Sequence, residues 1–303
     1  MQALASFVMR GRSQAAAVAL SAAVLSLFLP PLGLISSAIV VLVTLRRGLT
    51  EGLYVWLIAG VAAAPLAYIG LGSPAPALGF VLLLWMPVWL LSALLGYTRS
   101  FSVAVQAATL IGFMVILGVH LWTDDPTIHW IQLMEPMRQG LVEGQLIPET
   151  GSEALIAGLA QWMTGAFAAS LYFQCILALM LGRWWQALLY NPGGFGDEFR
   201  AFRMQRLLGL AAIGLVLLSL PRDDVGWPQE ALLLLVPLFL LQGLAVAHGL
   251  RANTGRHPGW LIGLYALFVF AFPYAEVLVA GVGFADLWLD FRSRFKGQGR
   301  NDA

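Results

Sequence analysis

The chain has 303 residues, of which 59% are hydrophobic and only 11% are charged, and its formal net charge at pH 7 is +1. Because ordinary soluble domains carry about 25% charged residues, this composition excludes a soluble globular protein and predicts an all-α, polytopic membrane protein. The 17 Lys and Arg residues stand in short clusters between apolar runs, so nothing in the charge indicates nucleic-acid binding.

Most of the apolar runs have the length of one membrane helix, which needs about 20 residues to cross the hydrocarbon core. They cover residues 52–70, 77–97, 102–122, 154–181, 207–220 and 231–250. Two further blocks, 15–45 and 260–291, are longer and are broken by Pro30 and Pro31 and by Pro273, respectively. Each block is either one kinked helix or a hairpin of two short segments, since proline disrupts a helix and disfavours the α conformation in the residue before it.

The basic residues distinguish these alternatives, because cytoplasmic loops carry an excess of Lys and Arg. With both blocks as hairpins there are ten segments, both termini are cytoplasmic, and 15 of the 17 basic residues lie inside. With both blocks as single helices the split is 9 to 8, and with only the second block as a hairpin it is 13 to 4. We therefore predict eight to ten segments, with both blocks as hairpins, in a single integral domain over residues 1–303 in the bacterial cytoplasmic (inner) membrane.

Three segments outside the apolar runs have defined positions in this topology. Residues 123–153 form an external loop rich in Asp and Glu, and the apolar spacing within it predicts a helix on the membrane surface. This loop is interpreted either as a structural cap over the external face or as a gate over a substrate cavity. Residues 183–206 form a cytoplasmic connector, and residues 292–303 form a cytoplasmic basic tail.

Two features are candidate partner surfaces. Ala15, Ala19 and Ala23 recur four residues apart, a spacing that lets helices approach closely, either within the protein or against a partner subunit. In the connector, four charged residues form either a solvated, salt-bridged segment or a docking site for a cytoplasmic partner. They are Asp197, Glu198, Arg200 and Arg203.

Six polar residues within apolar runs are candidates for a ligand cavity. They are Gln106, Gln161, Gln174, Gln242, His248 and Asp286. Polar groups inside a bilayer need partners, so hydrogen bonds between helices are the alternative to a polar ligand pocket. A hairpin at Pro273 places Asp286 about one turn from the cytoplasmic interface, where Arg206 or Arg251 is the expected partner.

The sequence carries no motif for enzyme catalysis. It lacks the Gly-x-Ser-x-Gly and His-Glu-x-x-His patterns and has no aspartate pair at catalytic spacing. We expect neither an enzyme nor a cofactor. His120 and His129 lie near two aspartates, but without Cys or further His at ligand spacing they do not predict a metal site. The single cysteine, Cys175, lies in an apolar run, which excludes a disulfide within the chain.

Three stretches, residues 191–199, 247–249 and 283–292, carry a resemblance to a family. They read Asn-Pro-Gly-Gly-Phe-Gly-Asp-Glu-Phe, Ala-His-Gly and Gly-Phe-Ala-Asp-Leu-Trp-Leu-Asp-Phe-Arg. In these motifs the chain resembles the YybS-like bacterial membrane proteins, a family of unassigned function that is distantly similar to the substrate-binding S components of energy-coupling-factor transporters. The resemblance implies a helical membrane fold of that type. It also implies that the alanine face at residues 15–23 meets a transmembrane coupling subunit.

Two hypotheses about function follow. The first is a transport-related membrane subunit that binds a small molecule and associates with a coupling or ATPase subunit. The second is a non-transporting scaffold that organises other membrane complexes through the connector and the small-residue faces.

Overall fold

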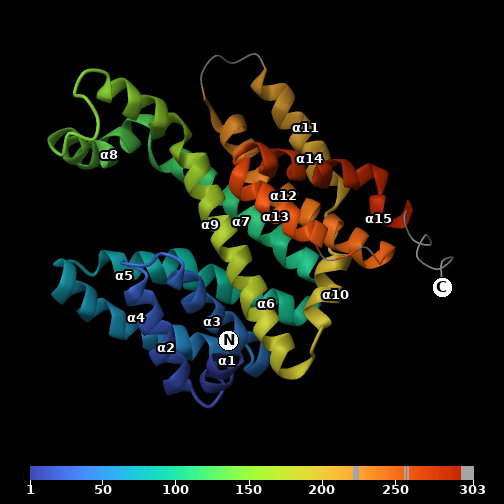
Figure 1. The fold of residues 1–303 in the computed structure, drawn as a ribbon. Helices are drawn as coiled ribbons and strands as arrows, with labels where there is room; N and C mark the ends of the chain where they lie inside the picture. Colours follow the sequence, from blue (N-terminus) through green and yellow to red (C-terminus); the bar gives the residue numbers. More distant parts are fainter. Residues whose placement is uncertain (221–224, 256, 258, 295–303) are drawn as a thin grey trace. The chain divides into compact units, whose positions relative to one another are not determined.

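The computed structural model describes residues 1–220, 225–255, 257 and 259–294. Throughout this part of the chain the regular structure is helical, and no strand occurs in it (Figure 1). The prediction of an all-α, polytopic membrane protein is confirmed, because several of these helices have the length and apolar composition of membrane spans.

The helices group into two compact units, although the sequence predicts a single domain over residues 1–303. The first unit comprises Met1–Ala108 and Leu171–Arg203, and the second comprises Thr109–Ser170 and Met204–Ala303. Two long helices, α7 (Phe101–Trp122) and α9 (Ser152–Tyr190), contribute residues to both units. At 39 residues, α9 is about 58 Å long, well beyond the roughly 30 Å of a hydrocarbon core.

The other elements each belong to one unit. The first unit contains α1 (Gln2–Val8), α2 (Arg12–Leu25), α3 (Leu32–Arg47), α4 (Leu49–Leu71), α5 (Ala75–Phe80), the π-helix η1 (Val81–Trp85), α6 (Met86–Thr98) and α10 (Gly194–Ala201). The second contains α8 (Pro126–Glu143), α11 (Arg206–Ser219), α12 (Trp227–Thr254), α13 (Gly259–Phe270), α14 (Tyr274–Leu289) and α15 (Phe291–Arg294).

Among the described residues, five helices are long and apolar enough to cross a membrane. They are Leu49–Leu71, Ala75–Thr98, Phe101–Trp122, Ser152–Tyr190 and Trp227–Thr254. A sixth span results if α10 and α11, which are bent by 51° across a short break, are counted together. The remaining apolar helices of 12 to 16 residues are the halves of the two proline-broken blocks, so the prediction of eight to ten segments depends on whether these short helices cross.

The first block is broken at its proline pair, as predicted. The chain leaves the helical pattern between Leu25 and Leu32, and α2 and α3 then pack against each other in the first unit. The buried hydroxyl of Ser36 on α3 donates a hydrogen bond of 2.7 Å to the carbonyl oxygen of Ala19 on α2. Close approach at a small residue therefore holds the two halves of this block together.

The second block also breaks at its proline, between α13 and α14, with a cis peptide bond between Phe272 and Pro273. Here the packing differs from a simple hairpin, because α14 lies mainly against α12. A Cβ on Gly283 would be 2.0 Å from the Phe239 carbonyl oxygen, and one on Gly243 would be 2.0 Å from the Val279 carbonyl oxygen. The two glycines thus allow the backbones of α12 and α14 to touch.

The span formed by α5, η1 and α6 changes its winding just before a proline. Pro87 has no amide hydrogen, so the helical hydrogen bond that would end at its nitrogen is missing. The chain accommodates this with a π-helical turn in which the Met86 amide bonds to the Val81 carbonyl. Trp85 in this turn is fully buried, and its indole Nε1 donates a 3.0 Å hydrogen bond to the Ser36 hydroxyl.

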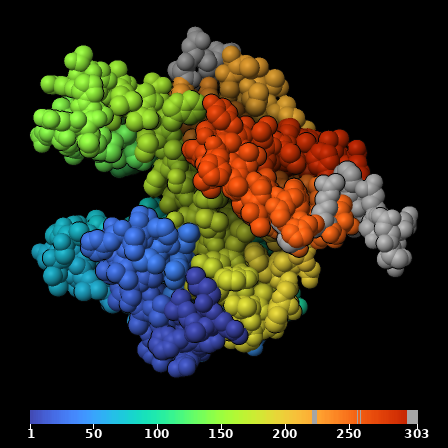
Figure 2. All heavy atoms as spheres, viewed as in Figure 1, coloured from blue at the N-terminus to red at the C-terminus, as the bar shows by residue number. Residues whose placement is uncertain are grey.

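The loop at residues 123–153 contains the predicted helix, α8. Asp125 caps its first turn by accepting a 3.1 Å hydrogen bond from the amide of Ile128. None of its residues is buried, and its green spheres lie at the surface in Figure 2. An exposed helix with apolar residues among polar ones is compatible with the predicted position at a membrane surface.

Candidate functional sites

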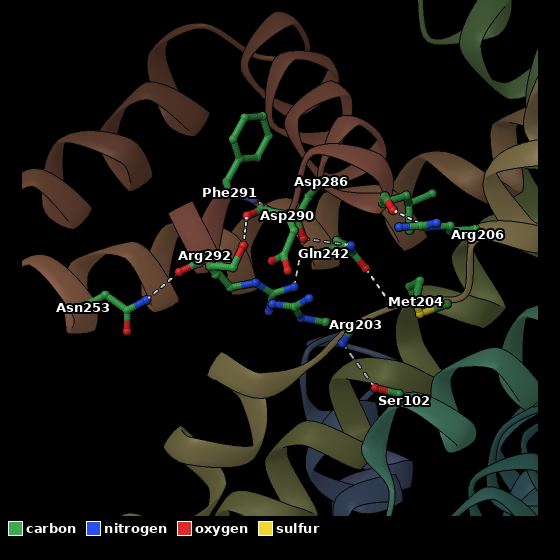
Figure 3. A network of polar contacts seen from close by, with 12 residues as sticks. Ser102, Arg203, Met204, Arg206, Gln242, Asn253, Asp286, Asp290, Phe291 and Arg292 are labelled. Atoms are coloured by element: carbon green, nitrogen blue, oxygen red, sulfur yellow. Dashed lines mark hydrogen bonds and ion pairs between the residues drawn. The ribbon is translucent and has the colours of Figure 1, made fainter. Parts of the chain in front are cut away.

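A buried polar network in the second unit surrounds Asp286 on α14 (Figure 3). The carboxylate forms an ion pair of 2.8 Å with Arg292 on α15, and both side chains are at least 96% buried. Its Oδ2 also accepts a 3.1 Å hydrogen bond from the amide of Gln242 on α12, and its Oδ1 accepts one of 2.9 Å from the Phe291 amide. Three donors, one from α12 and two from α15, therefore satisfy one buried charge.

The same network holds the neighbouring backbone segments. The side-chain oxygen of Gln242 accepts a 2.7 Å hydrogen bond from the amide of Met204, the connector residue at which the chain enters the second unit again. Asn253 on α12 donates to the carbonyl oxygen of Arg292 at 3.0 Å. Arg206 at the start of α11 donates to the carbonyl oxygen of Leu287 at 3.1 Å. The network therefore joins four helices, α11, α12, α14 and α15.

The expected partner of Asp286 is corrected by these contacts. The sequence favours Arg206 or Arg251, but the ion pair is formed by Arg292. The physical reason is the backbone at Asp290, which ends α14 in the left-handed conformation with φ 42°. This reversal turns the chain back over the end of α14, and Arg292, six residues after Asp286, reaches the carboxylate. Residues 295–303 of the predicted basic tail lie outside the described residues.

Only Gln242 and Asp286 among the six predicted cavity residues are brought into contact. Gln106 is bonded within its own helix, to the carbonyl oxygen of Ser102 at 3.1 Å. Gln161 on α9 is exposed. His248 on α12 bonds through Nδ1 to the Leu244 carbonyl oxygen at 2.9 Å. Its Nε2 lies 3.3 Å from the hydroxyl of Tyr265 on α13. Gln174 on α9 belongs to the first unit.

The first unit contains an apolar cavity of about 240 Å³ that is partly open to its surroundings. Its walls come from the ends of α2 and α4 and from α5 and η1, and all the lining residues are apolar. They include Ala23, Leu27, Ala63, Gly70, Phe80 and Trp85. Alanine and glycine on the helix walls leave the space, because larger side chains at those positions would fill it.

This cavity lies far from the charged end of the first unit. At that end Arg12 on α2 pairs with Glu51 in the first turn of α4, and Arg46 stacks on the Tyr190 ring at 4.0 Å. The cavity is formed instead by the opposite ends of α2 and α4. From Glu51 to Gly70 the helical rise is about 29 Å, close to the thickness of a hydrocarbon core. The first unit therefore carries charged residues at one end of α2 and α4 and the apolar cavity at the other end.

A second, more open apolar cavity of about 410 Å³ lies in the second unit, between α11, α12 and α14. Val216, Leu235, Phe239 and Phe284 contribute to its walls. None of the six predicted cavity residues lines either of these two cavities. The spaces observed in the two units are thus apolar, whereas the polar residues in the sequence suggest either hydrogen bonds between helices or a polar pocket.

The candidate partner surfaces are mostly occupied by contacts within the first unit. Ala15, Ala19 and Ala23 are at most 8% exposed, so their face packs inside the unit, which is the first of the two alternatives for this spacing. In the connector, Glu198 pairs with Arg183 on α9 at 2.8 Å. Asp197 pairs with Arg200, and the Arg203 amide donates to the Ser102 hydroxyl at 3.3 Å. These pairs agree with the salt-bridged interpretation of the connector.

A second buried carboxylate was not predicted as a site. Glu230 in the first turn of α12 is 3% exposed and lies 2.7 Å from Nε2 of His120 on α7. By sequence Glu230 lies just outside an apolar run, which begins at residue 231. The signal that would have found it is Pro228 at the start of the helix, which marks a helix beginning at Trp227 and thus places Glu230 inside it.

No group of three or more His, Cys, Asp or Glu side chains within the described residues is arranged to hold a metal ion. Within the described residues, the fold and these sites define a polytopic α-helical membrane protein that contains the Asp286 network, the His120–Glu230 pair and the apolar cavities described above. Comparisons with protein-family models, with curated proteins and with solved structures find no match to this chain. The resemblance to the YybS-like proteins therefore rests on its sequence motifs alone.

Proposed function

We propose that this protein is a transport-related membrane subunit that binds an apolar or amphipathic small molecule in the cavity of the first unit. The single observation that carries the proposal is the cavity itself, which has a volume of about 240 Å³ and is lined by apolar residues. For comparison, an engineered apolar cavity of about 150 Å³ is large enough to bind benzene. The class of ligand that fits such walls is one with a hydrocarbon or aromatic body.

A polar group beside the cavity favours an amphipathic ligand. A Cβ built on Gly33 would lie 3.2 Å from Nε2 of Gln174 and 3.7 Å from the ring of Phe80, which lines the cavity. Gln174 is partly buried, and among the described residues no hydrogen-bond partner satisfies its side-chain amide. An uncharged carbonyl or hydroxyl on the ligand would satisfy this amide, whereas a charged group would find no counter-charge on the cavity wall.

The membrane orientation expected from the basic residues supports a role of the cavity in binding a ligand, rather than a purely structural role. The arginine-rich end of the first unit is predicted to face the cytoplasm, so the cavity is expected near the external side of the membrane. A site there can receive a molecule from outside or from the outer leaflet. Association with a coupling or ATPase subunit remains part of this proposal.

The test compares small molecules that copurify with two matched glycine variants. Gly70 lines the cavity and Gly79 does not, and a Cβ at either position meets no atom within 4 Å. Both Gly70→Leu and Gly79→Leu are therefore tolerated by the backbone surroundings, but only Gly70→Leu reduces the cavity. After purification in mild detergent, organic extraction and mass spectrometry identify the bound species.

We expect a lipophilic species that is retained by the unaltered protein and by Gly79→Leu but falls at least about fivefold in Gly70→Leu, because overfilling a site costs about 1–3 kcal/mol. Bulk phospholipids should be equal in all three samples. Equal retention of every species in Gly70→Leu would refute the cavity as the binding site. Capture of a coupling or ATPase subunit in the same preparation would support transport, and its absence would favour a binding protein without transport.

A further inference from the structure

The pair formed by His120 and Glu230 stands apart from the cavity and from the Asp286 network. Glu230 is 3% exposed, and its carboxylate lies 2.7 Å from Nε2 of His120. The His120 side chain is 31% exposed. Within the described part of the chain, this imidazole is the one side chain that hydrogen-bonds to the carboxylate. The pair thus joins a buried acid, Glu230, to a partly exposed base, His120.

The backbone around Glu230 is closely packed. A Cβ on Gly165 of α9 would lie 2.7 Å from the Cα of Glu230, so the helices touch at this point. A Cβ on Gly112 of α7 would lie 2.7 Å from a methyl carbon of Leu234, one turn further along α12. Because α7, α9 and α12 meet here without space for a large adjustment, Glu230 cannot readily move its carboxylate into water.

A buried carboxylate without an Arg or Lys partner is unfavourable unless a proton compensates its charge. The position of Glu230 near the N-terminus of α12 offsets part of the cost of a negative charge, but it supplies no proton. Among the described residues, His120 is the side chain placed to share one. A proton held by the pair makes it neutral overall, either as imidazolium with carboxylate or as imidazole with carboxylic acid, and its loss leaves a negative charge enclosed in the protein.

Other titratable or charged side chains lie on the elements around the pair, but among the described residues none bonds to it. Glu135 and Arg138 on α8 bond to each other at 2.7 Å, and the ring of His129 packs on Trp122. The remaining ones nearby in the chain are Asp124, Asp125, Glu143, Glu149 and Glu153. Arg222, Asp223 and Asp224 lie outside the described residues.

From this geometry we infer that His120 and Glu230 form a proton-binding site that holds α7 against α12. The bound proton adds to either the imidazole nitrogen or the carboxylate oxygen, and no other bond forms or breaks. When the proton leaves, the contact between α7 and α12 is weakened. The inference is independent of the cavity and of the proposed ligand.

The test is the melting temperature of the detergent-purified protein as a function of pH, from about pH 5 to about pH 9, a range that brackets the ordinary titration of histidine near 6.5. Loss of the shared proton leaves an enclosed negative charge and weakens the contact between α7 and α12, so the melting temperature should fall as the pH rises. Glu230→Gln removes the need for the proton and should abolish most of this fall. His129→Gln, at the neighbouring α8, is the matched control and should keep it.

A second variant keeps the inference testable if Glu230→Gln does not yield folded protein. In the double variant with His120→Gln and Glu230→Gln, two neutral amides can hydrogen-bond in place of the pair. The melting temperature of this double variant should depend on pH as little as that expected for Glu230→Gln. The inference is overturned if the unaltered protein shows no fall, if the variants that lack Glu230 retain it, or if His129→Gln loses it.

Discussion

Replacing Arg292 by Met tests whether the buried ion pair with Asp286 holds the C-terminal end of the described chain. Both side chains are at least 96% buried, and removing one partner of a buried pair costs about 3–5 kcal/mol. Two of the three donors to the carboxylate, Gln242 and the Phe291 amide, remain in Arg292→Met, so the lower value of about 3 kcal/mol is expected. At about 2–4 °C per kcal/mol, the melting temperature should fall by about 6–12 °C.

The assay is thermal unfolding in detergent, followed by the loss of monodisperse protein on size exclusion. Adding Asp286→Asn to Arg292→Met removes the unpaired charge and leaves an amide oxygen as acceptor, so the double variant should recover at least half of the loss. Arg12→Gln breaks the exposed pair with Glu51 and should change little. If Arg292→Met behaved like Arg12→Gln, or if the double variant were no better than Arg292→Met, the argument from buried charge would be refuted.

Two further predictions concern other contacts. Gly283→Ala or Gly243→Ala should destabilise the packing of α14 on α12 by about 1–3 kcal/mol or more, because a Cβ at either position would be 2.0 Å from a carbonyl oxygen. Gly281→Ala, where a Cβ meets nothing within 4 Å, is the control, and equal melting temperatures for the three variants would contradict this. On α8, hydrogen bonds from Arg138 and then Gln139 lower the pKa of Glu135 to about 2. Its stabilising effect is therefore present above the ordinary Glu pKa of about 4.3 and is lost as the pH falls through about 2. Proteolysis of α8 should accelerate in acid in the unaltered protein, and a Glu135→Gln variant with the same acid dependence would argue against the role of this pair.

The fold was predictable where a single residue type constrains the backbone. Pro30 and Pro31 predict the break between α2 and α3, and Pro273 predicts the break between α13 and α14, because proline cannot continue the helical hydrogen bonding. The packing after the second break was not predictable. It depends on the close approach of Gly243 and Gly283, and glycines in apolar runs are too common to indicate which pair will meet.

The sites were predictable in part. Asp286 and Gln242 were predicted as candidates because burying a polar group in an apolar environment costs free energy, and the structure brings the two side chains into hydrogen-bond contact. The partner Arg292 could not be found, because a left-handed residue at Asp290 is uncommon for a residue other than glycine. The apolar cavity leaves no sequence signal, since it arises from the way in which side chains of several helices fail to fill one space.

The position of Cys175 has a practical consequence for mapping the membrane topology. It is the only cysteine of the chain, and it is 4% exposed on α9. A thiol enclosed by apolar side chains reacts slowly with water-soluble reagents. A cysteine introduced at Pro31 or at Phe272, at the two proline breaks, would then react in preference to Cys175, so Cys175 need not be removed. Labelling of intact cells with a reagent that does not cross the membrane would show directly whether the short helices bring these breaks to the external face.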